Sequence, residues 1–407
     1  METSLVTTMR ARRVLLTLAL LVSLALGGCA SQPSSASTGS SKQLLTGDPV
    51  LDAQSAALKA RPQDRLLWTY RGAAAAMRRG LYTDARRMLD EAVTQLGGIV
   101  GKDRSARKAR SVFNRESRKT FYGEPYERVM AYYYRAILYW MDGEPDNARA
   151  CFRSAQLADS DAESKSFSGD YVLLEYLDGL VSTKLGGDGS DAYKRALATP
   201  HIAVPPPYST NANVLFFVEY GSGPTKRAGG EYGEQLQFRL GSSPVQSARI
   251  RVANFDVEVA AYDDLNFQAT TRGGRVMDKV LSNKADFKKT TDNVGDAAIV
   301  SGAVLGSTTH RNNEAALGLV AAGLLSKIFS SVTTPEADTR SWDNLPLFLS
   351  FAAIPLPPGQ YPATVDFLDL QHHPIPVLSK QITLNIPAAK GDKVVFVSVQ
   401  SITPQTL

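Results

Sequence analysis

The residues that are able to do acid, base or metal chemistry are few and widely spaced. The sequence has four histidines and two cysteines: His201, His310, His372, His373, Cys29 and Cys151. It contains no His-Glu-x-x-His motif for zinc and no Gly-x-Ser-x-Gly elbow for a serine nucleophile. His372 and His373 are adjacent, and neighbouring strand residues point to opposite faces, so this pair is poorly placed to chelate a metal. We therefore predict no catalytic residue, no metal and no cofactor.

Two other segments combine residue types found at binding sites. Gly221-Ser-Gly-Pro-Thr-Lys226 follows an expected strand, as a phosphate loop does, but it lacks the GxxxxGK[ST] spacing. We expect a hairpin connection with a basic tip there. The segment Asp338–Pro346 mixes charged residues with the indole of Trp342. We expect Arg340 to stack on Trp342 at a domain junction; a recognition surface is the alternative.

Cys29 lies in a context that predicts covalent modification. A basic stretch at residues 10–13 precedes an apolar run over residues 14–26. The run has the length of a secretory signal and is shorter than the roughly 20 residues of a spanning helix. It ends in Leu26-Gly-Gly-Cys29, which resembles the lipobox of bacterial lipoproteins. The resemblance implies cleavage after residue 28 and acyl groups on Cys29; an ordinary signal peptide with a chance cysteine is the alternative.

The residues after Cys29 bear on location. Residues 30 and 31 are Ala and Ser, whereas the resembled family marks inner-membrane retention with Asp after the cysteine. The resemblance therefore implies the outer membrane, and we expect the body to face the periplasm. Several acyl chains on one residue give stable attachment to a membrane. Residues 29–44 are Ser-rich and predict a flexible tether between lipid and body.

Cys151 has no partner for a disulfide if Cys29 is acylated. It lies in a helical pattern among Ala148, Ala150 and Phe152. We expect a buried, inert thiol; a reactive thiol is the alternative.

Length and composition limit the class of protein. The 407 residues are 43% hydrophobic and 21% charged, which excludes collagen, coiled-coil and wholly disordered classes. The length predicts two folded domains. The net charge is +5, and three of the arginines lie in the first 28 residues, so charge gives no indication of nucleic-acid binding.

Residues 45–200 predict helical repeats. Ala73 and Ala85 are 12 residues apart, and so are Ala136 and Ala148. In both copies a large apolar residue lies four positions after the second alanine. The spacing resembles the tetratricopeptide repeat, in which small residues lie where two antiparallel helices cross. About 29 extra residues separate the two copies, and a degenerate third copy is expected after them.

The resemblance implies a concave face lined by the first helix of each repeat. We predict a groove on this face for an extended or helical apolar peptide. Its predicted residues are Leu67, Tyr70, Met77, Arg78, Met130, Tyr133, Ile137, Trp140 and Met141. The alternative is that neighbouring helices or the second domain cover them and that they are core.

The insertion between the repeats is strongly basic. Its predicted basic patch consists of Lys102, Arg104, Arg107, Lys108, Arg110, Arg115, Arg118 and Lys119. A solvated surface segment is one interpretation. The other is electrostatic contact with anionic envelope material such as phospholipid head groups. We expect no nucleic-acid partner for an exported, membrane-tethered chain.

Beyond the prolines at 205–207 the hydrophobic period changes to two, which predicts a β-sandwich-like domain over residues 201–407. The expected strands are 214–219, 235–240, 248–254, 256–261, 347–353, 360–367, 381–386 and 393–401. Residues 274–331 interrupt them. Their Ala- and Gly-rich part predicts a helical hairpin over 294–331, either packed on the sandwich or docked into a membrane or a partner oligomer.

Four further motifs are Tyr122–Arg128, the repeat at 132–155, Gly221–Lys226, and Arg340–Trp342 with Leu345–Pro346. Together they resemble a family of bacterial envelope lipoproteins with tetratricopeptide-like helices. That family has no assigned activity, so the resemblance implies location and architecture only.

We expect an α+β multidomain chain that acts as a non-enzymatic, membrane-anchored adaptor or scaffold for a protein partner. Envelope assembly, secretion and peptidoglycan-related work are the expected settings. One alternative is a structural component that oligomerises through the 294–331 hairpin. Another is an enzyme or small-ligand binder with an unrecognised site.

Overall fold

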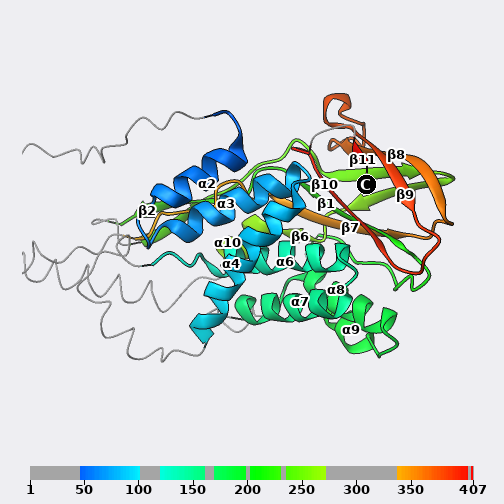
Figure 1. The fold of residues 1–407 in the computed structure, drawn as a ribbon, viewed down its shortest axis with the longest axis horizontal. Helices are drawn as coiled ribbons and strands as arrows, with labels where there is room; N and C mark the ends of the chain where they lie inside the picture. The colour runs from blue at the N-terminus through cyan, green and yellow to red at the C-terminus, as the bar shows by residue number, and fades with distance from the viewer. Residues whose placement is uncertain are drawn as a thin grey trace, which may run out of the picture. The chain divides into compact units, whose positions relative to one another are not determined.

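Helices fill the first half of the fold and strands fill the second (Figure 1). The computed structural model describes residues 46–100, 120–160, 169–198, 202–230, 235–271, 337–401 and 405–406. The chain divides into Met1–Thr46 and Gly47–Leu407, and the helices and strands lie in the second unit. The expectation of a mixed α+β chain is confirmed.

Each helix packs against the helix that follows it in the sequence, from the first to the last of the helical region. The helices are α2 (Pro49–Lys59), α3 (Arg65–Arg78), α4 (Tyr82–Val100), α6 (Pro125–Met141), α7 (Pro145–Asp159), α8 (Val172–Lys184), α9 (Ser190–Ala198) and the later α10 (Leu265–Thr270). Prolines at the first turn and acidic caps start three of them. None of the helices in the described ranges is long and apolar enough to cross a membrane.

Small residues lie where consecutive helices meet. Ala73, Ala85, Ala136 and Ala148 are all fully buried. At Gly72 in α3, an added Cβ would lie 2.8 Å from Met88 Sδ of α4. The close approach of these helices therefore depends on small side chains, as the 12-residue spacing predicts.

The strands form two main sheets and a separate hairpin. Their bounds are β1 (Val214–Tyr220), β2 (Thr225–Gly229), β3 (Gln235–Arg239), β4 (Ser247–Val252), β5 (Phe255–Ala260), β6 (Asp263–Asp264), β7 (Phe348–Ile354), β8 (Gly359–Leu368), β9 (Lys380–Ile386), β10 (Lys393–Ser398) and β11 (Gln405–Thr406). One sheet has the order β10-β1-β7-β6 and the other β11-β9-β8-β4-β5, while β2 pairs only with β3. In the first sheet β1 pairs parallel with β10 and antiparallel with β7.

Strand β1 explains the layered arrangement. All seven of its residues are buried, because alternate side chains enter two different cores. Leu215 and Phe217 join the core shared with the helices. Val214, Phe216 and Val218 join the core between the two sheets. The order of layers is therefore helices, four-stranded sheet, five-stranded sheet.

The helical and β-rich regions are layers of one compact unit. The larger core contains Tyr70 and Trp140 from the helices together with Phe351 and Phe396 from the sheet. The predicted boundary near residue 200 therefore marks a change of layer, and the larger core continues across it. The physical reason is that the four-stranded sheet is apolar on both faces and needs a cover on each.

Candidate functional site

The predicted groove is part of the core. Eight of its residues are buried and Met141 is partly buried. The ring of Phe217 in β1 lies 6.2 Å from Tyr133 and 6.1 Å from Trp140, centroid to centroid. The prediction of an open peptide groove is therefore wrong, because the four-stranded sheet covers the face on which these residues lie.

Several predictions fall outside the described residues, among them the signal segment 1–28 and the Ser-rich tether 29–44. Three others concern candidate sites. They are lipidation at Cys29, the basic patch from Lys102 to Lys119, and the 294–331 hairpin within the 274–331 insertion. Each of them stays a prediction.

Cys151 has a protonated thiol, and His372 contacts a carboxylate at the surface. Cys151 on α7 is partly buried, and burial raises the pKa of its thiol to about 11, so the thiol stays protonated at neutral pH. His372 is exposed and its Nδ1 lies 2.6 Å from Glu258 Oε1. Over the ranges that the structure describes, no three His, Cys, Asp or Glu residues are grouped as metal ligands.

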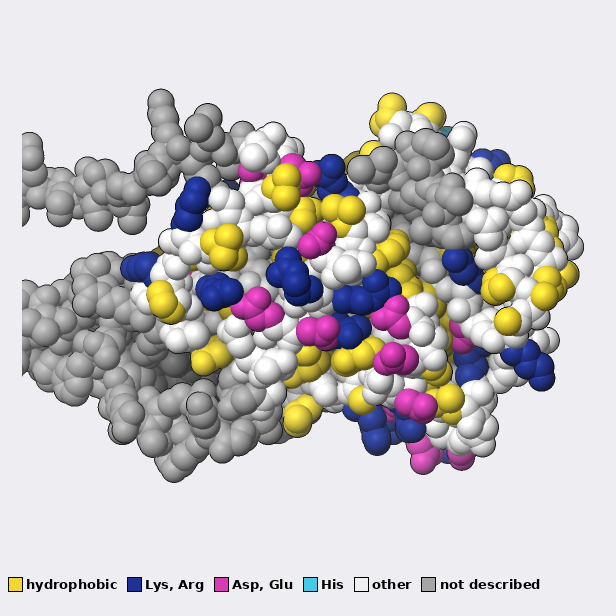
Figure 2. All heavy atoms as spheres, viewed as in Figure 1, with side chains coloured by type: hydrophobic (Ala, Val, Ile, Leu, Met, Phe, Trp, Pro, Cys, Tyr) yellow, Lys and Arg dark blue, Asp and Glu magenta, His cyan; other side chains and the backbone are white. Residues whose placement is uncertain are grey.

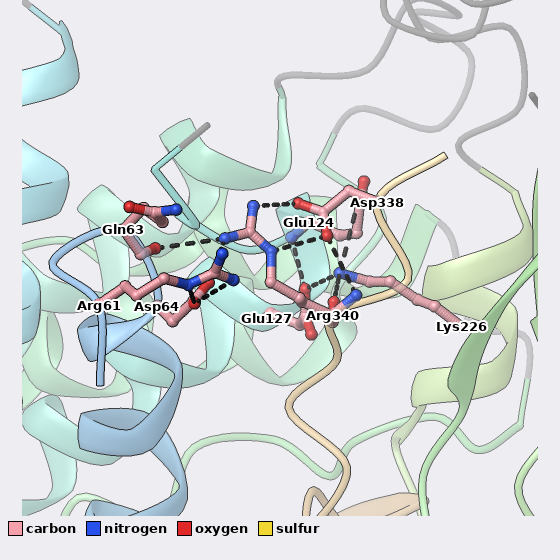
Figure 3. A network of polar contacts seen from close by, with 8 residues as sticks. All are labelled: Arg61, Gln63, Asp64, Glu124, Glu127, Lys226, Asp338 and Arg340. Atoms are coloured by element: carbon pink, nitrogen blue, oxygen red, sulfur yellow. Dashed lines mark hydrogen bonds and ion pairs between the residues drawn. The ribbon is translucent and has the colours of Figure 1, made fainter. Parts of the chain in front are cut away.

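The ionisable groups that do converge lie between the helices and the segment Ala337–Leu345 (Figure 3). We call them the Lys226 network. Its members are Asp64, Glu124, Glu127, Lys226, Asp338 and Arg340. They come from the N-cap of α3, from α6 and its N-cap, from β2, and from the segment that leads into β7.

Lys226 is the centre of this network. Its side chain is 1% exposed, and its Nζ lies 2.5 Å from Glu127 Oε2, whose side chain is fully buried. Nζ also donates to the backbone oxygen of Arg340 at 2.9 Å. The prediction of a basic tip on a hairpin is therefore wrong: the loop at Gly221 leads into β2, and β2 carries Lys226 inward toward α6.

Glu127 uses both carboxylate oxygens. Oε1 accepts from the backbone N–H of Trp342 at 2.6 Å. Oε2 accepts from Lys226 and from the N–H of Glu124, the latter at 2.6 Å as part of a capping box at the start of α6. Burial raises the pKa of Glu127, and the nearby Lys226 charge opposes that rise. The carboxylate thus joins one helix to two segments that are distant in sequence.

Arg340 and Trp342 do not stack on each other as predicted. Arg340 pairs with Asp338 at 2.6 Å and with Asp64 at 2.7 Å. Trp342 instead stacks on Tyr70 of α3, with ring centroids 4.4 Å apart and an interplanar angle of 12°. The position at the junction of helices and sheet agrees with the expectation, but carboxylates satisfy the guanidinium and a phenol ring covers the indole.

A second group links α3 and α6 to β1. Arg78 Nε donates to Glu219 Oε1 at 2.7 Å, and Tyr134 Oη donates to Glu219 Oε2 at 2.6 Å. All three side chains are buried. Arg78 also donates to Gln400 Oε1 at 3.1 Å. A buried carboxylate in a strand is thereby matched by donors from two helices.

Two more carboxylates link α6 and α8 to the β-rich region. Asp392 accepts from Trp140 Nε1 at 2.9 Å and pairs with Lys184 at 2.8 Å. Asp263 of β6 accepts from the first N–H groups of α8, those of Val172 and Leu173, both at 2.9 Å. Burial raises the pKa of Asp263 to about 8, although the two N–H bonds oppose that rise.

Sequence reasoning did not find Glu127, Glu219 or Asp263. A signal existed for Glu219, because it is the single charge in the otherwise apolar strand Val-Leu-Phe-Phe-Val-Glu-Tyr, and a charge in such a strand needs a buried partner. Glu127 and Lys226 lie in two of the motifs that carry the family resemblance, Tyr122–Arg128 and Gly221–Lys226, but they are 99 residues apart and no local pattern indicates that they pair. In each of these groups, donors from another layer form hydrogen bonds with the carboxylate. These interactions hold the layers together.

Comparison with known proteins gives no relative. No protein-family model matches the chain, and neither does any curated protein or solved structure at a significant level. Inferences about function therefore rest on the sequence and on the geometry described above.

Proposed function

We propose that this protein is a lipid-anchored, non-enzymatic scaffold of the bacterial cell envelope, attached to the outer membrane and facing the periplasm. The observation that carries the proposal is Leu26-Gly-Gly-Cys29 at the end of an apolar run. Acyl groups on Cys29 hold the chain at a membrane, and the folded unit that follows is presented to partners.

The helical layer is proposed to be a short tetratricopeptide-like array. Buried alanines at matching places in α3, α4, α6 and α7 support this, as does the packing of each helix on the next. The proposed array departs from the repeat pattern in two respects: about 29 extra residues separate the two copies, and the protein's own sheet packs against the helices on the face predicted to be a groove. A partner would therefore bind the outer surface of the body.

The distribution of ionisable side chains favours a scaffold over an enzyme. Glu127, Glu219 and Asp263 each accept at least two hydrogen bonds from the protein's own donors. A general acid or base must lie within hydrogen-bonding reach of a substrate. The buried carboxylates described here instead connect layers. On the outer face, acidic and basic side chains alternate (Figure 2).

Crosslinking of the native lipidated protein in bacterial cells tests this function. We expect a defined crosslinked species that contains a second envelope protein, and we expect it to disappear in Cys29→Ser, which is made but not anchored. A wild-type protein that is anchored yet gives no crosslinked species would contradict the scaffold. Species whose masses are multiples of this chain alone would favour the oligomeric structural component instead.

A further inference from the structure

Two exposed leucines lie on the outer face of α2, a helix that packs against α3 within the part of the chain that the structure describes. The helix buries Val50, Ala53 and Ala56. Leu51 and Leu58 are 54% and 80% exposed. Residues seven apart lie two turns apart on the same side of a helix, so the two leucines form a short stripe opposite the buried face.

A third exposed leucine lies in the turn between α3 and α4. Asp48, the N-cap of α2, pairs with Arg79 at 3.0 Å, which brings the start of α2 to the end of α3. Leu81 follows in the turn to α4 and is 41% exposed. Scattered exposed leucines are ordinary on protein surfaces, so exposure alone does not identify what the two leucines bind. The position of α2 in the chain indicates the surface that they contact.

Helix α2 is the first described helix after the predicted anchor at Cys29. Nineteen residues lie between Cys29 and Pro49, and the fully extended chain from one to the other spans about 70 Å. A flexible Ser-rich chain of this length has an average end-to-end distance of about 25 Å. The bilayer that holds the acyl groups is therefore present near α2 at high effective concentration.

We propose that α2 docks on the lipid bilayer through Leu51 and Leu58 and so orients the body at the membrane. The inference rests on the proposed acyl anchor at Cys29. Two leucines would not hold a free protein at a membrane, but a tethered protein needs only a weak contact to favour one orientation. Lys59 follows Leu58 directly and suits the head-group region beside the apolar contact. Arg61 is 64% exposed but already pairs with Asp64 at 2.8 Å, so Lys59 is the basic residue that the docking uses.

An environment-sensitive fluorophore on α2 tests the docking. The full lipidated chain with Cys151→Ala carries the fluorophore at Ser55→Cys, because Ser55 lies on the leucine stripe. The protein is reconstituted into vesicles of phosphatidylethanolamine and phosphatidylglycerol. We expect a blue shift of emission on reconstitution. A fluorophore at Lys194→Cys on α9, where the native side chain is 75% exposed, should show none.

Matched leucine variants identify the contact. Leu51→Ser with Leu58→Ser should lower the ratio of docked to undocked protein about tenfold per leucine and abolish the blue shift. Leu157→Ser with Leu197→Ser removes two exposed leucines from α7 and α9 and should leave the shift intact. Thermal unfolding of both variants should match the parent protein, since the substituted side chains are exposed.

The outcomes separate the docking from the anchor. A protein that floats with the vesicles but shows no shift overturns the docking and leaves the anchor standing. A protein that does not float overturns both. A shift that appears in Cys29→Ser without vesicles, and grows with protein concentration, shows that a second copy covers α2 and also overturns the inference.

Discussion

Lys226 and Glu127 are both removed from water, so each depends on the other. A buried ion pair is costly to form, because both charges lose hydration. Once it has formed, removal of one partner leaves the other buried without compensation. Glu127 also accepts from the backbone of Trp342, so its charge lies at the point where three segments meet.

Lys226→Met should therefore destabilise the protein strongly. We expect a loss of about 3–5 kcal/mol in the free energy of unfolding, measured by urea denaturation. Lys194→Met is the matched control, because the Lys194–Asp191 pair is 75% and 83% exposed and its loss should change little. Equal effects of the two substitutions would contradict the structural role of the Lys226 network.

Asp263 should make stability depend on pH. Its pKa rises from the ordinary value of 3.8 to about 8 because of burial. Between these values the native state holds a proton that the unfolded state has released. The contribution of Asp263 to stability is thus fully present below about pH 4 and is lost as the pH rises toward 8, with a slope of up to about 1.4 kcal/mol per pH unit.

Comparison with Asp263→Asn isolates this contribution. Urea unfolding of both proteins between about pH 5 and 8 should give a difference in free energy that falls as the pH rises. Asn has a neutral side chain of the same shape at every pH, so the free energy of unfolding of Asp263→Asn lacks this pH-dependent contribution. A difference that stays constant over this range would contradict the raised pKa and would mean that the N–H groups of α8 keep Asp263 ionised.

At the scale of elements, Gly179 of α8 sets how closely the next segments approach. An added Cβ would lie 1.9 Å from Tyr208 Oη and 2.8 Å from the backbone oxygen of Gly189. Both distances are far below van der Waals contact. Tyr208 packs beside Tyr176 of the same helix, with ring centroids 5.0 Å apart, so it has little room to retreat.

Gly179→Ala should destabilise the protein by about 1–3 kcal/mol through overpacking, even though alanine is the better helix former. Gly97→Ala in α4 is the control, because an added Cβ there meets nothing within 4 Å. It should stabilise the protein by about 0.5–1 kcal/mol. Chemical denaturation of both variants checks the pair, and a stabilised Gly179→Ala would contradict the tight packing.

Alternation in the sequence predicted the main strands well. The expected strands at 214–219 and 381–386 differ by one residue from β1 and β9, and Pro145 starts α7 as expected. These features are local, so period and proline position determine them. Strand β2 was also missed, because its start was interpreted as a hairpin connection. The short strands β6 and β11 were missed because two residues carry no period.

The candidate site was harder to predict, because periodicity identifies an apolar face but not what covers it. Tyr133 and Trp140 were correctly placed on the inner side of α6, yet the sequence left open whether a partner or the protein itself fills the space. Phe217 of β1 fills it. Pairing between residues as distant as Arg78 and Glu219 depends on the tertiary arrangement of layers, which local patterns do not specify.

At the scale of the whole molecule, the helices and the four-stranded sheet share one core. Trp140 is 1% exposed and joins the layers through Phe217 and Asp392. A substitution there affects both layers at once. The protein should therefore unfold in a single cooperative transition in which helical and β-sheet signals change together.

Trp140→Ala should lower the free energy of unfolding by about 3–5 kcal/mol. As a groove residue it would instead have altered partner binding and left the fold intact. Denaturation followed by circular dichroism distinguishes the two roles. An unchanged free energy of unfolding would support the original prediction of an open groove. Leu157→Ala, at a 58% exposed leucine of α7, is the control and should have a small effect.

The most direct test of the proposed function is the mass of the N-terminal peptide of the native protein extracted from bacterial membranes. A peptide that begins at Cys29 and carries a thioether-linked diacylglycerol and an N-acyl group is the expected result. A peptide that retains residues upstream of Cys29, or has a free Cys29 thiol, would contradict a lipid-anchored scaffold.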